Sequence, residues 1–295
     1  MRVGTRASAL ALAQAQWVAE LLGPGAEIVT VTTLGDRGAA VQDKSRWVSE
    51  LERALLDGRI DVAVHSAKDV PTELTEGLEL VAVPARADAR DAICGASAFG
   101  DLPSGSRIGT SSVRRAAQIR ALRDDLEVVQ VRGNVDTRLR KLAEGQVDAL
   151  VLAYAGLQRL GRSAEAGGVI DAFVPAAGQG ALALEARPGS IGVEALAHVI
   201  DVGAMACVSA ERELVHALGA SCNTPVGAHA RAMADGRLEL TGWVGLPDGS
   251  AWLSDHVLGD PTTAGPECAA RMLAAGAAEL LREAERELAA LPRSA

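Results

Sequence analysis

Residues 60–71, IDVAVHSAKDVP, join a short β-branched run to a group of polar side chains. The run ending at Val64 predicts a buried strand, and the polar side chains that follow it begin at His65 and end at Asp69. In open α/β sheets, ligands bind at the carboxyl ends of the strands. The stretch therefore predicts an α/β fold with a ligand site at this edge, although a polar loop after a strand is more often simply solvated.

The composition is typical of a globular chain with a core of small aliphatic residues. The chain has 295 residues, of which 48% are hydrophobic and 2% aromatic. This length predicts two or three domains. Few aromatic rings are available to stack on bases, and the formal net charge of −9 disfavours DNA or an anionic membrane. We therefore expect no nucleic-acid partner and no membrane partner.

The termini and the cysteines give expectations about the compartment. The N-terminus enters a predicted strand at once, without the apolar segment of a signal peptide, and no apolar run reaches the length of a membrane helix. Cys94, Cys207, Cys222 and Cys268 lie far apart, without the paired spacing of a zinc site or a disulfide framework. The sequence predicts a reduced, cytoplasmic protein without a bound metal. The oligomeric state does not follow from the sequence, and a monomer is our working expectation.

An internal repeat predicts two related α/β domains. Residues 2–8, RVGTRAS, and 107–112, RIGTSS, each predict a strand, a Gly-Thr turn and a serine-capped helix, the helices running to about Leu22 and Arg123. Residues 57–64 and 144–151 each predict a helix that ends at glycine, followed by a buried strand. Unless this similarity is chance, two domains with parallel sheets face each other across a cleft. Helix N-termini at the two Gly-Thr turns would suit anions.

The C-terminal region follows a different pattern. Residues 202–218 predict a helix, residues 237–244 and 251–258 predict strands joined by a turn at 247–249, and residues 263–291 have helical periodicity. This order predicts a small α+β domain with an antiparallel sheet. The predicted limits are 1–84 with 181–200 for the first domain, 88–176 for the second and 203–295 for the third.

Basic residues gather within one part of this acidic chain. Residues 102–145 contain nine Lys or Arg and five Asp or Glu, a local net charge of +4. Arginine binds carboxylates through two parallel hydrogen bonds, so arginines at turns and helix starts predict an anion site. Arginines within the helices, such as Arg120, Arg123 and Arg140, are expected to be solvated. The arginines predicted to line one cleft are Arg6, Arg114, Arg115, Arg132, Arg138 and Arg159.

Six motifs together resemble the porphobilinogen deaminase family, in that family's order. They are TRASALAL at 5–12, HSAKDVP at 65–71, GTSSVRR at 109–115, VRGNVDTR at 131–138, AGLQRLG at 155–161 and PAAGQGA at 175–181. The resemblance implies two α/β domains like those of type II periplasmic binding proteins around a cleft, plus a small α+β domain. It also implies hydroxymethylbilane synthase activity in heme biosynthesis. Such an enzyme joins four porphobilinogen molecules head to tail on a bound dipyrromethane and releases the linear tetrapyrrole by hydrolysis.

The resemblance assigns the cofactor to a cysteine. In the family a dipyrromethane is attached through a thioether to a cysteine of the third domain. The matching segment here is residues 218–227, LGASCNTPVG, so the resemblance implies Cys222 as the attachment point. The thiolate is the form that attacks an electrophilic carbon. A cysteine taken alone is more often a small buried hydrophobe, which is our interpretation of the other three cysteines.

Asp69 is the predicted catalytic residue. Each reaction cycle expels ammonia from porphobilinogen and places positive charge on a pyrrole nitrogen, which an ionised carboxylate can stabilise while mediating proton transfer. Lys68 is expected to bind a substrate carboxylate, with a simple exposed lysine as the alternative. The further residues implied to bind cofactor and substrate are Ser8, Ser66, Thr110, Ser111, Ser112, Gly133, Asn134 and Gln179, besides the six arginines.

Two segments depart from the family pattern. Residues 36–48 lack the glycines of the family's KxGGKGLF loop. Lys44 matches its second lysine, the first lysine has no counterpart, and Trp47 replaces its phenylalanine. We still expect this loop to cover the cleft. Ala220 and Ser221 replace two glycines before the cysteine. A family member without activity is therefore one alternative. Another is a non-catalytic solute-binding protein, against which the third domain with Cys222 argues.

Overall fold

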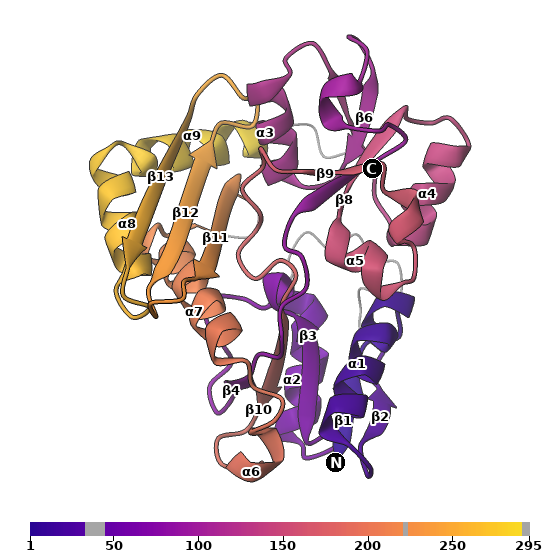
Figure 1. Cartoon of the computed structure of the whole chain (residues 1–295), viewed down its shortest axis with the longest axis vertical. Coiled ribbons are helices and arrows are strands. Elements are labelled where there is room, and N and C mark those ends of the chain that lie inside the picture. Colours follow the sequence, from indigo (N-terminus) through magenta and orange to yellow (C-terminus); the bar gives the residue numbers. More distant parts are fainter. Residues whose placement is uncertain (33–44, 221–223, 291–295) are drawn as a thin grey trace.

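The structure, a computed structural model, describes residues 1–32, 45–220 and 224–290. Within these ranges the strands form three sheets, two of five strands and one of three. Figure 1 shows the two larger sheets in separate lobes, with the C-terminal sheet and its helices beside them. Among the described helices, none combines the length and hydropathy that a membrane span needs.

The first sheet has the strand order β2-β1-β3-β10-β4. β1 pairs in parallel with β2 and β3, whereas β10 runs antiparallel to both β3 and β4. The helices α1 and α2 contact this sheet. Its strands are β1 (Arg2–Thr5), β2 (Glu27–Thr30), β3 (Val62–Ser66), β4 (Glu79–Ala82) and β10 (Leu182–Ala186), and its helices are α1 (Ala9–Leu22), α2 (Ser45–Leu56) and the short α6 (Val193–Leu196).

The second sheet repeats this arrangement strand for strand, in the order β7-β6-β8-β5-β9. β6 is parallel to β7 and β8, and β5 is antiparallel to β8 and β9. The predicted pair of similar α/β domains is therefore confirmed. The elements are β5 (Asp91–Cys94), β6 (Arg107–Thr110), β7 (Glu127–Gln130), β8 (Ala149–Ala153) and β9 (Gly168–Ile170), with α3 (Val113–Leu122), α4 (Val135–Ala143) and α5 (Tyr154–Arg159).

The prediction of parallel sheets was wrong for one strand in each domain. β5 and β10 are entered directly from the two segments that cross between the sheets, residues 83–90 and 171–181. Each of these strands runs antiparallel to both of its neighbours, so both sheets are mixed. Because β10 follows the second sheet in sequence but completes the first, two crossing segments connect the lobes. The lobes also meet where α1 contacts α5 (Figure 1).

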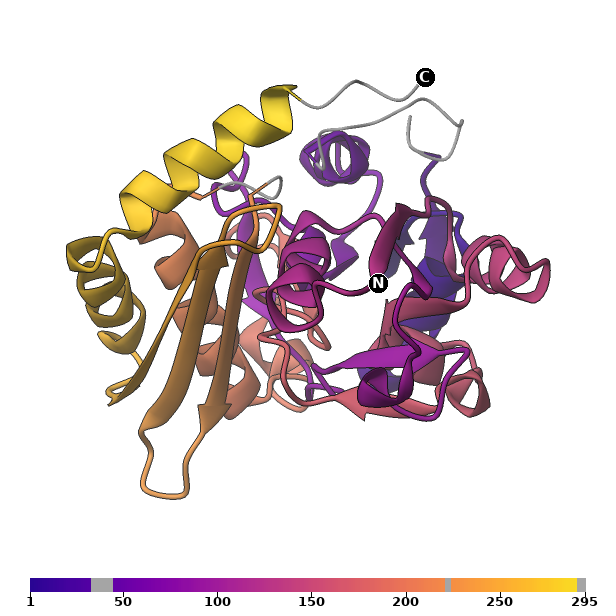
Figure 2. The same cartoon turned by 90° about the horizontal axis from the view of Figure 1, so that it is seen from above.

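The C-terminal part is an antiparallel three-stranded sheet covered by helices, as predicted. Figure 2 shows α8 and α9 on the outer side of this sheet, and its other side faces α3, which contacts β12. β11 was not predicted, and the helical region after residue 263 is two helices that divide near Gly276, at a φ of 103°. The elements are α7 (Val202–Ala217), β11 (Val226–Ala232), β12 (Leu238–Gly245), β13 (Trp252–Gly259), α8 (Ala264–Ala274) and α9 (Ala277–Ala290).

Candidate active site

The polar group of residues 65–71 lies at the carboxyl end of β3, as the sequence predicts. Lys68 and Asp69 stand on the 3-10 turn η2 (Ala67–Asp69), which follows β3 directly, and both are half-buried. The turn is fixed to the second crossing segment, because the Ala67 N–H donates to the carbonyl of Ala181 at 3.0 Å. Gly178 of that segment has a φ of 72° and packs closely against the turn, because a Cβ at this position would lie 2.9 Å from the backbone nitrogen of Lys68.

Three of the predicted binding side chains begin helices. Ser8, Ser112 and Asn134 are the N-caps of α1, α3 and α4, and each accepts a hydrogen bond from a backbone N–H of the first turn, at 3.3, 3.4 and 2.9 Å. The predicted serine caps are confirmed. These helices start at the carboxyl ends of β1, β6 and β7, where their free N–H groups and dipoles favour anions.

Arg114 and Arg115 occupy the first turn of α3, but they do not line an open surface. They are only 4% and 6% exposed, and both pair with Asp91, the fully buried first residue of β5. Asp91 Oδ2 accepts from Arg114 Nη2 at 2.7 Å, and Oδ1 accepts from Arg115 Nη2 at 2.7 Å and Nε at 3.0 Å. Sequence reasoning missed Asp91, whose signal is a lone carboxylate at the start of an apolar strand.

The electrostatics of this cluster leave one positive charge without compensation. Burial alone would raise the pKa of Asp91, but the charges of the two arginines outweigh it and hold this pKa far below its usual range. Burial lowers the pKa of Arg114, and the Arg114 Nε has no hydrogen-bond partner among the described residues. Two guanidinium groups sharing one carboxylate can therefore still attract an anion.

Arg138 and Arg159 are basic groups held by neutral partners. Arg138 donates to the Gly133 carbonyl at 2.8 Å and to the Ser111 hydroxyl at 3.0 Å, and Arg159 donates to the Gly180 carbonyl at 2.7 Å. Burial lowers the pKa of each arginine to about 10. Within the described residues no carboxylate forms an ion pair with either, so both fit an anionic ligand.

Gln179 connects the two halves of the site. This side chain is 1% exposed, and its Nε2 donates to Asp91 Oδ1 at 2.8 Å and to the Ala89 carbonyl at 2.7 Å. Its Oε1 accepts from Lys68 Nζ at 3.3 Å and from Arg115 Nη2 at 3.5 Å. The amide therefore links the Lys68–Asp69 turn of the first sheet to the arginine pair of the second sheet.

The remaining predicted residues lie near these groups or outside the described part. Ser66 ends β3, Arg6 follows β1, and the buried Thr110 ends β6, where its hydroxyl accepts from the Ser112 N–H at 3.1 Å. Arg132 is exposed beside Gly133. Cys222, Lys44 and the side chain of Trp47 lie outside the described residues.

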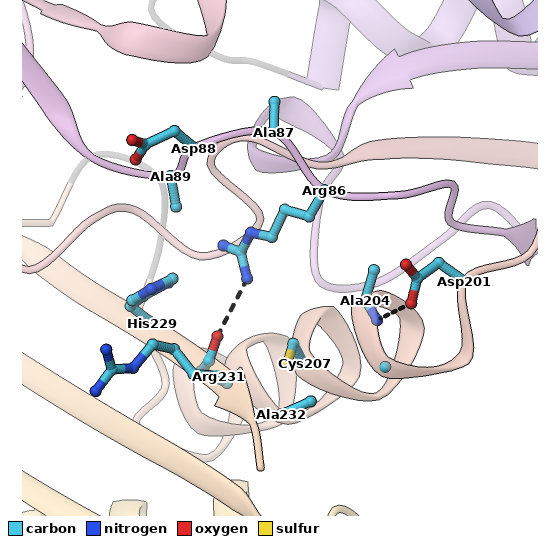
Figure 3. A pocket seen from close by; sticks show the side chains of 12 residues that line it. Arg86, Ala87, Asp88, Ala89, Asp201, Ala204, Cys207, His229, Arg231 and Ala232 are labelled. Carbon is cyan, nitrogen blue, oxygen red and sulfur yellow. Dashed lines mark hydrogen bonds between the residues drawn. The ribbon is translucent and has the colours of Figure 1, made fainter. Parts of the chain in front are cut away.

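A second buried ion pair fixes the third sheet to the crossing segments. Glu211 of α7 is fully buried and accepts two hydrogen bonds from Arg86, at 2.6 and 3.1 Å, besides backbone N–H groups of Gly178 and Ala230 at 2.6 and 2.7 Å. Figure 3 shows Arg86 reaching toward β11 in a pocket of about 360 Å³ that Cys207 and His229 also line. None of the predicted site residues lines this pocket. Among the described residues, no group of acidic, histidine or cysteine side chains could hold a metal ion.

Comparison with known proteins identifies the family. Residues 1–194 match the model of the "Porphobilinogen deaminase, dipyromethane cofactor binding domain", and residues 205–274 match that of the "Porphobilinogen deaminase, C-terminal domain". The chain belongs to the porphobilinogen deaminase family. The porphobilinogen deaminase of Deinococcus deserti is 47% identical, over 97% of this chain and 98% of the relative, and that of Deinococcus radiodurans is 46% identical over the same shares.

The family membership confirms the prediction of a transferase of tetrapyrrole biosynthesis and of a dipyrromethane cofactor. The solute-binding alternative is not favoured. Among solved structures, the methionine-binding protein MetQ is 15% identical, with a TM-score of 0.43 over 68% of this chain and 88% of that chain.

Proposed function

We propose that this chain is a hydroxymethylbilane synthase that works through Asp69 and the arginines around it. It deaminates four porphobilinogen molecules, joins them head to tail and releases the linear tetrapyrrole. The observation that best supports this proposal is that Arg138 and Arg159 are largely buried yet form no ion pair within the described residues. Each pyrrole of the substrate brings an acetate and a propionate, which suit such cations.

The arginines fit a dipyrromethane because that group carries four carboxylates. Arg138 and Arg159 offer donors to them, and Arg132 lies exposed next to Gly133, whose carbonyl accepts from Arg138. The proposed binding set is completed by Arg6, Ser8, Ser66, Thr110, Ser111, Ser112, Asn134 and Gln179. Lys44 and Trp47 stay proposed residues of the active-site loop on the strength of the family motif alone. Cys222 is the proposed attachment point by a thioether, in the segment that follows α7. When bound, the group supplies the nucleophilic pyrrole carbon to which substrate is added.

The side chains of the turn after β3 perform the chemistry in this proposal. Lys68, tied to Gln179, holds a substrate carboxylate and so fixes the pyrrole ring beside the turn. The carboxylate of Asp69 lies next to the pyrrole N–H and stabilises the positive charge that develops as ammonia leaves. It then assists removal of the proton from the carbon that has formed the new bond. Half-burial of the turn strengthens these interactions relative to water.

The test is incubation of the purified protein with porphobilinogen, followed by product analysis and intact mass. We expect release of ammonia and a linear tetrapyrrole, and a protein mass above that of the sequence by two pyrrole units. Binding of porphobilinogen without ammonia release would instead indicate the non-catalytic alternative, and a release that persists in a protein without the added mass would contradict the role of the cofactor.

The setting of the enzyme is also part of the proposal. A monomer in the cytoplasm, with neither nucleic acid nor membrane as partner, is consistent with the net charge of −9. The domain limits of 1–84 with 181–200, 88–176 and 203–295 are supported because each sheet draws all of its strands from within one of them. Light scattering at several protein concentrations tests the monomer, and limited proteolysis tests the limits.

A further inference from the structure

We propose that Asp91 is a positioning residue of the active site, whose carboxylate holds the guanidinium groups of Arg114 and Arg115 in the orientation that receives pyrrole carboxylates. This inference rests on the proposed function, in which the two arginines bind cofactor and substrate. Asp91 itself is fully buried, so it acts through the arginines rather than on the ligand.

The contacts of Asp91 fix it on every side. As the first residue of β5 it pairs with Ala153 of β8 and Ile170 of β9, so its backbone is held between two neighbouring strands of the second sheet. Both carboxylate oxygens are engaged by arginine, and Oδ1 also accepts from Gln179 at 2.8 Å. The carboxylate is thus a rigid anchor for two side chains that otherwise have many rotamers.

The arginine pair needs such an anchor because of its charge. Two adjacent guanidinium groups in the first turn of α3 repel each other and would turn apart toward water. Asp91 draws both inward, and backbone carbonyls of Val174 and Val151 accept from the opposite nitrogens at 2.7 and 3.1 Å. Since one carboxylate neutralises only half of the charge, the pair is oriented and yet remains able to bind an anion.

The anchor also relates the arginines to the catalytic turn. Gln179 donates to Asp91 through Nε2 and accepts from Lys68 through Oε1, and Lys68 precedes Asp69 on the turn. These groups come from both larger sheets and from the segment that crosses between them. The position of Asp91 therefore helps to set the distance between the carboxylate-binding arginines and Asp69.

The test compares Asp91→Asn and Asp91→Glu with the wild type and with Asp88→Asn as matched control. Asp88 lies three residues earlier, on the crossing segment that leads into β5, pairs with Arg90, and points away from Arg86 in Figure 3. Two quantities are measured: the rate at which apoprotein gains the cofactor mass from porphobilinogen, and KM and kcat of the loaded protein. For Asp91→Asn we expect cofactor loading to be slower by about tenfold or more. We also expect the factor by which KM rises to be larger than the factor by which kcat falls.

Asp91→Glu separates positioning from charge compensation. It keeps the negative charge, and so guards against a failure of Asp91→Asn to fold, but it displaces the carboxylate and with it both guanidinium groups. A displacement of about 1 Å can cost up to roughly a hundredfold in rate, so we expect slow loading. The added methylene should also lower the stability by about 1–3 kcal/mol, because the site is fully buried. Wild-type loading and KM in Asp91→Glu would overturn the positioning role.

Failure of the proposed function gives a different result. If Arg114→Leu and Arg115→Leu also load and turn over like the wild type, the two arginines do not bind the pyrrole carboxylates, and the assignment of the site is wrong. If the two arginine variants are impaired while both Asp91 variants behave like Asp88→Asn, only the role of Asp91 is refuted.

Discussion

Replacing Glu211 by glutamine should destabilise the protein more than any other single change of one charged side chain in α7. Glu211 is fully buried and accepts four hydrogen bonds, two from Arg86 and one each from the N–H groups of Gly178 and Ala230. A glutamine offers only one acceptor oxygen, and its amide nitrogen would face a backbone N–H. The substitution therefore leaves Arg86 without a counter-charge and a buried donor without an acceptor.

The expected loss of stability in Glu211→Gln can be worked out from these broken contacts. Removing one partner of a buried ion pair costs about 3–5 kcal/mol. An unfolding entropy of about 2.1 cal/mol/K per residue gives about 0.6 kcal/mol/K for 295 residues. If the chain unfolds as one unit, the melting temperature at pH 7 should fall by about 5–8 °C. The activity should fall as well, because the same carboxylate holds Gly178, which packs against the turn of Lys68.

The difference in melting temperature between the wild type and Glu211→Gln should depend on pH in a definite direction. Burial raises the pKa of Glu211, but the charge and the hydrogen bonds of Arg86 outweigh it, so the pKa lies below its ordinary value. The stabilisation is then complete above the unfolded pKa of about 4.3 and is lost as the pH falls through the lower folded pKa. The gap in melting temperature between wild type and Glu211→Gln should be constant from about pH 6 to 8 and narrow below about pH 4.

Differential scanning calorimetry at several pH values measures both effects. Glu213→Gln, two residues further along the same helix, is the control, because Glu213 is exposed and should change the melting temperature little. A Glu211→Gln protein that melts within about 1 °C of the wild type at pH 7 would refute the assignment of this ion pair as the junction of the third sheet.

Four further results are expected. Asp69→Asn should lower single-turnover ammonia release by roughly a hundredfold or more at an almost unchanged melting temperature, and near-normal release would refute its catalytic role. Cys222→Ala should lack the added mass of two pyrrole units, whereas an active protein without that mass would contradict the thioether. Gly178→Ala should lose stability by about 1–3 kcal/mol in a chemical-denaturation curve, because its φ of 72° is unfavourable for alanine and a Cβ would meet the Lys68 backbone; an unchanged midpoint would speak against this close packing. Single replacement by leucine of each of four arginines, Arg114, Arg115, Arg132 and Arg138, should stall elongation at intermediate lengths visible by mass spectrometry. Wild-type products from all four variants would disprove the assignment of these arginines to the cleft.

Local sequence signals predicted much of this fold. The Gly-Thr turns with serine caps predicted the starts of α1 and α3, because an N-cap depends only on residues within one turn. The helix ends at Gly58 and Gly145 were equally local, and both glycines have positive φ. The antiparallel β5 and β10 were missed because their direction depends on which sheet each crossing segment enters, and no neighbouring residue encodes that choice.

Long-range partners explain what the sequence did not reveal of the site. Asp91 is 23 residues from Arg114 and 88 from Gln179, and Glu211 is 125 residues from Arg86. Asp91 begins an apolar strand and Glu211 is followed by two further charged residues, so in the sequence each resembles an ordinary surface position. The motifs contain Lys68, Gln179 and Arg115, which the structure brings together although they lie far apart in sequence. Ser8 and Ser112 were predicted both as helix caps and as candidate ligand groups, whereas the capping role of Asn134 was not predicted.

The charge of the cleft depends on partners more than on the count of basic residues. The excess of four positive charges in residues 102–145 includes Arg107, which pairs with Asp148, and two arginines that share Asp91. Both aspartates lie outside that window, so half of the apparent excess is compensated. What remains for a polycarboxylate is concentrated where cations meet only carbonyl and hydroxyl groups, at Arg138 and, beyond the window, Arg159. A group of carboxylates entering this region would therefore be attracted first to the α4 and α5 side of the site, with the pair oriented by Asp91 as the second point of attachment.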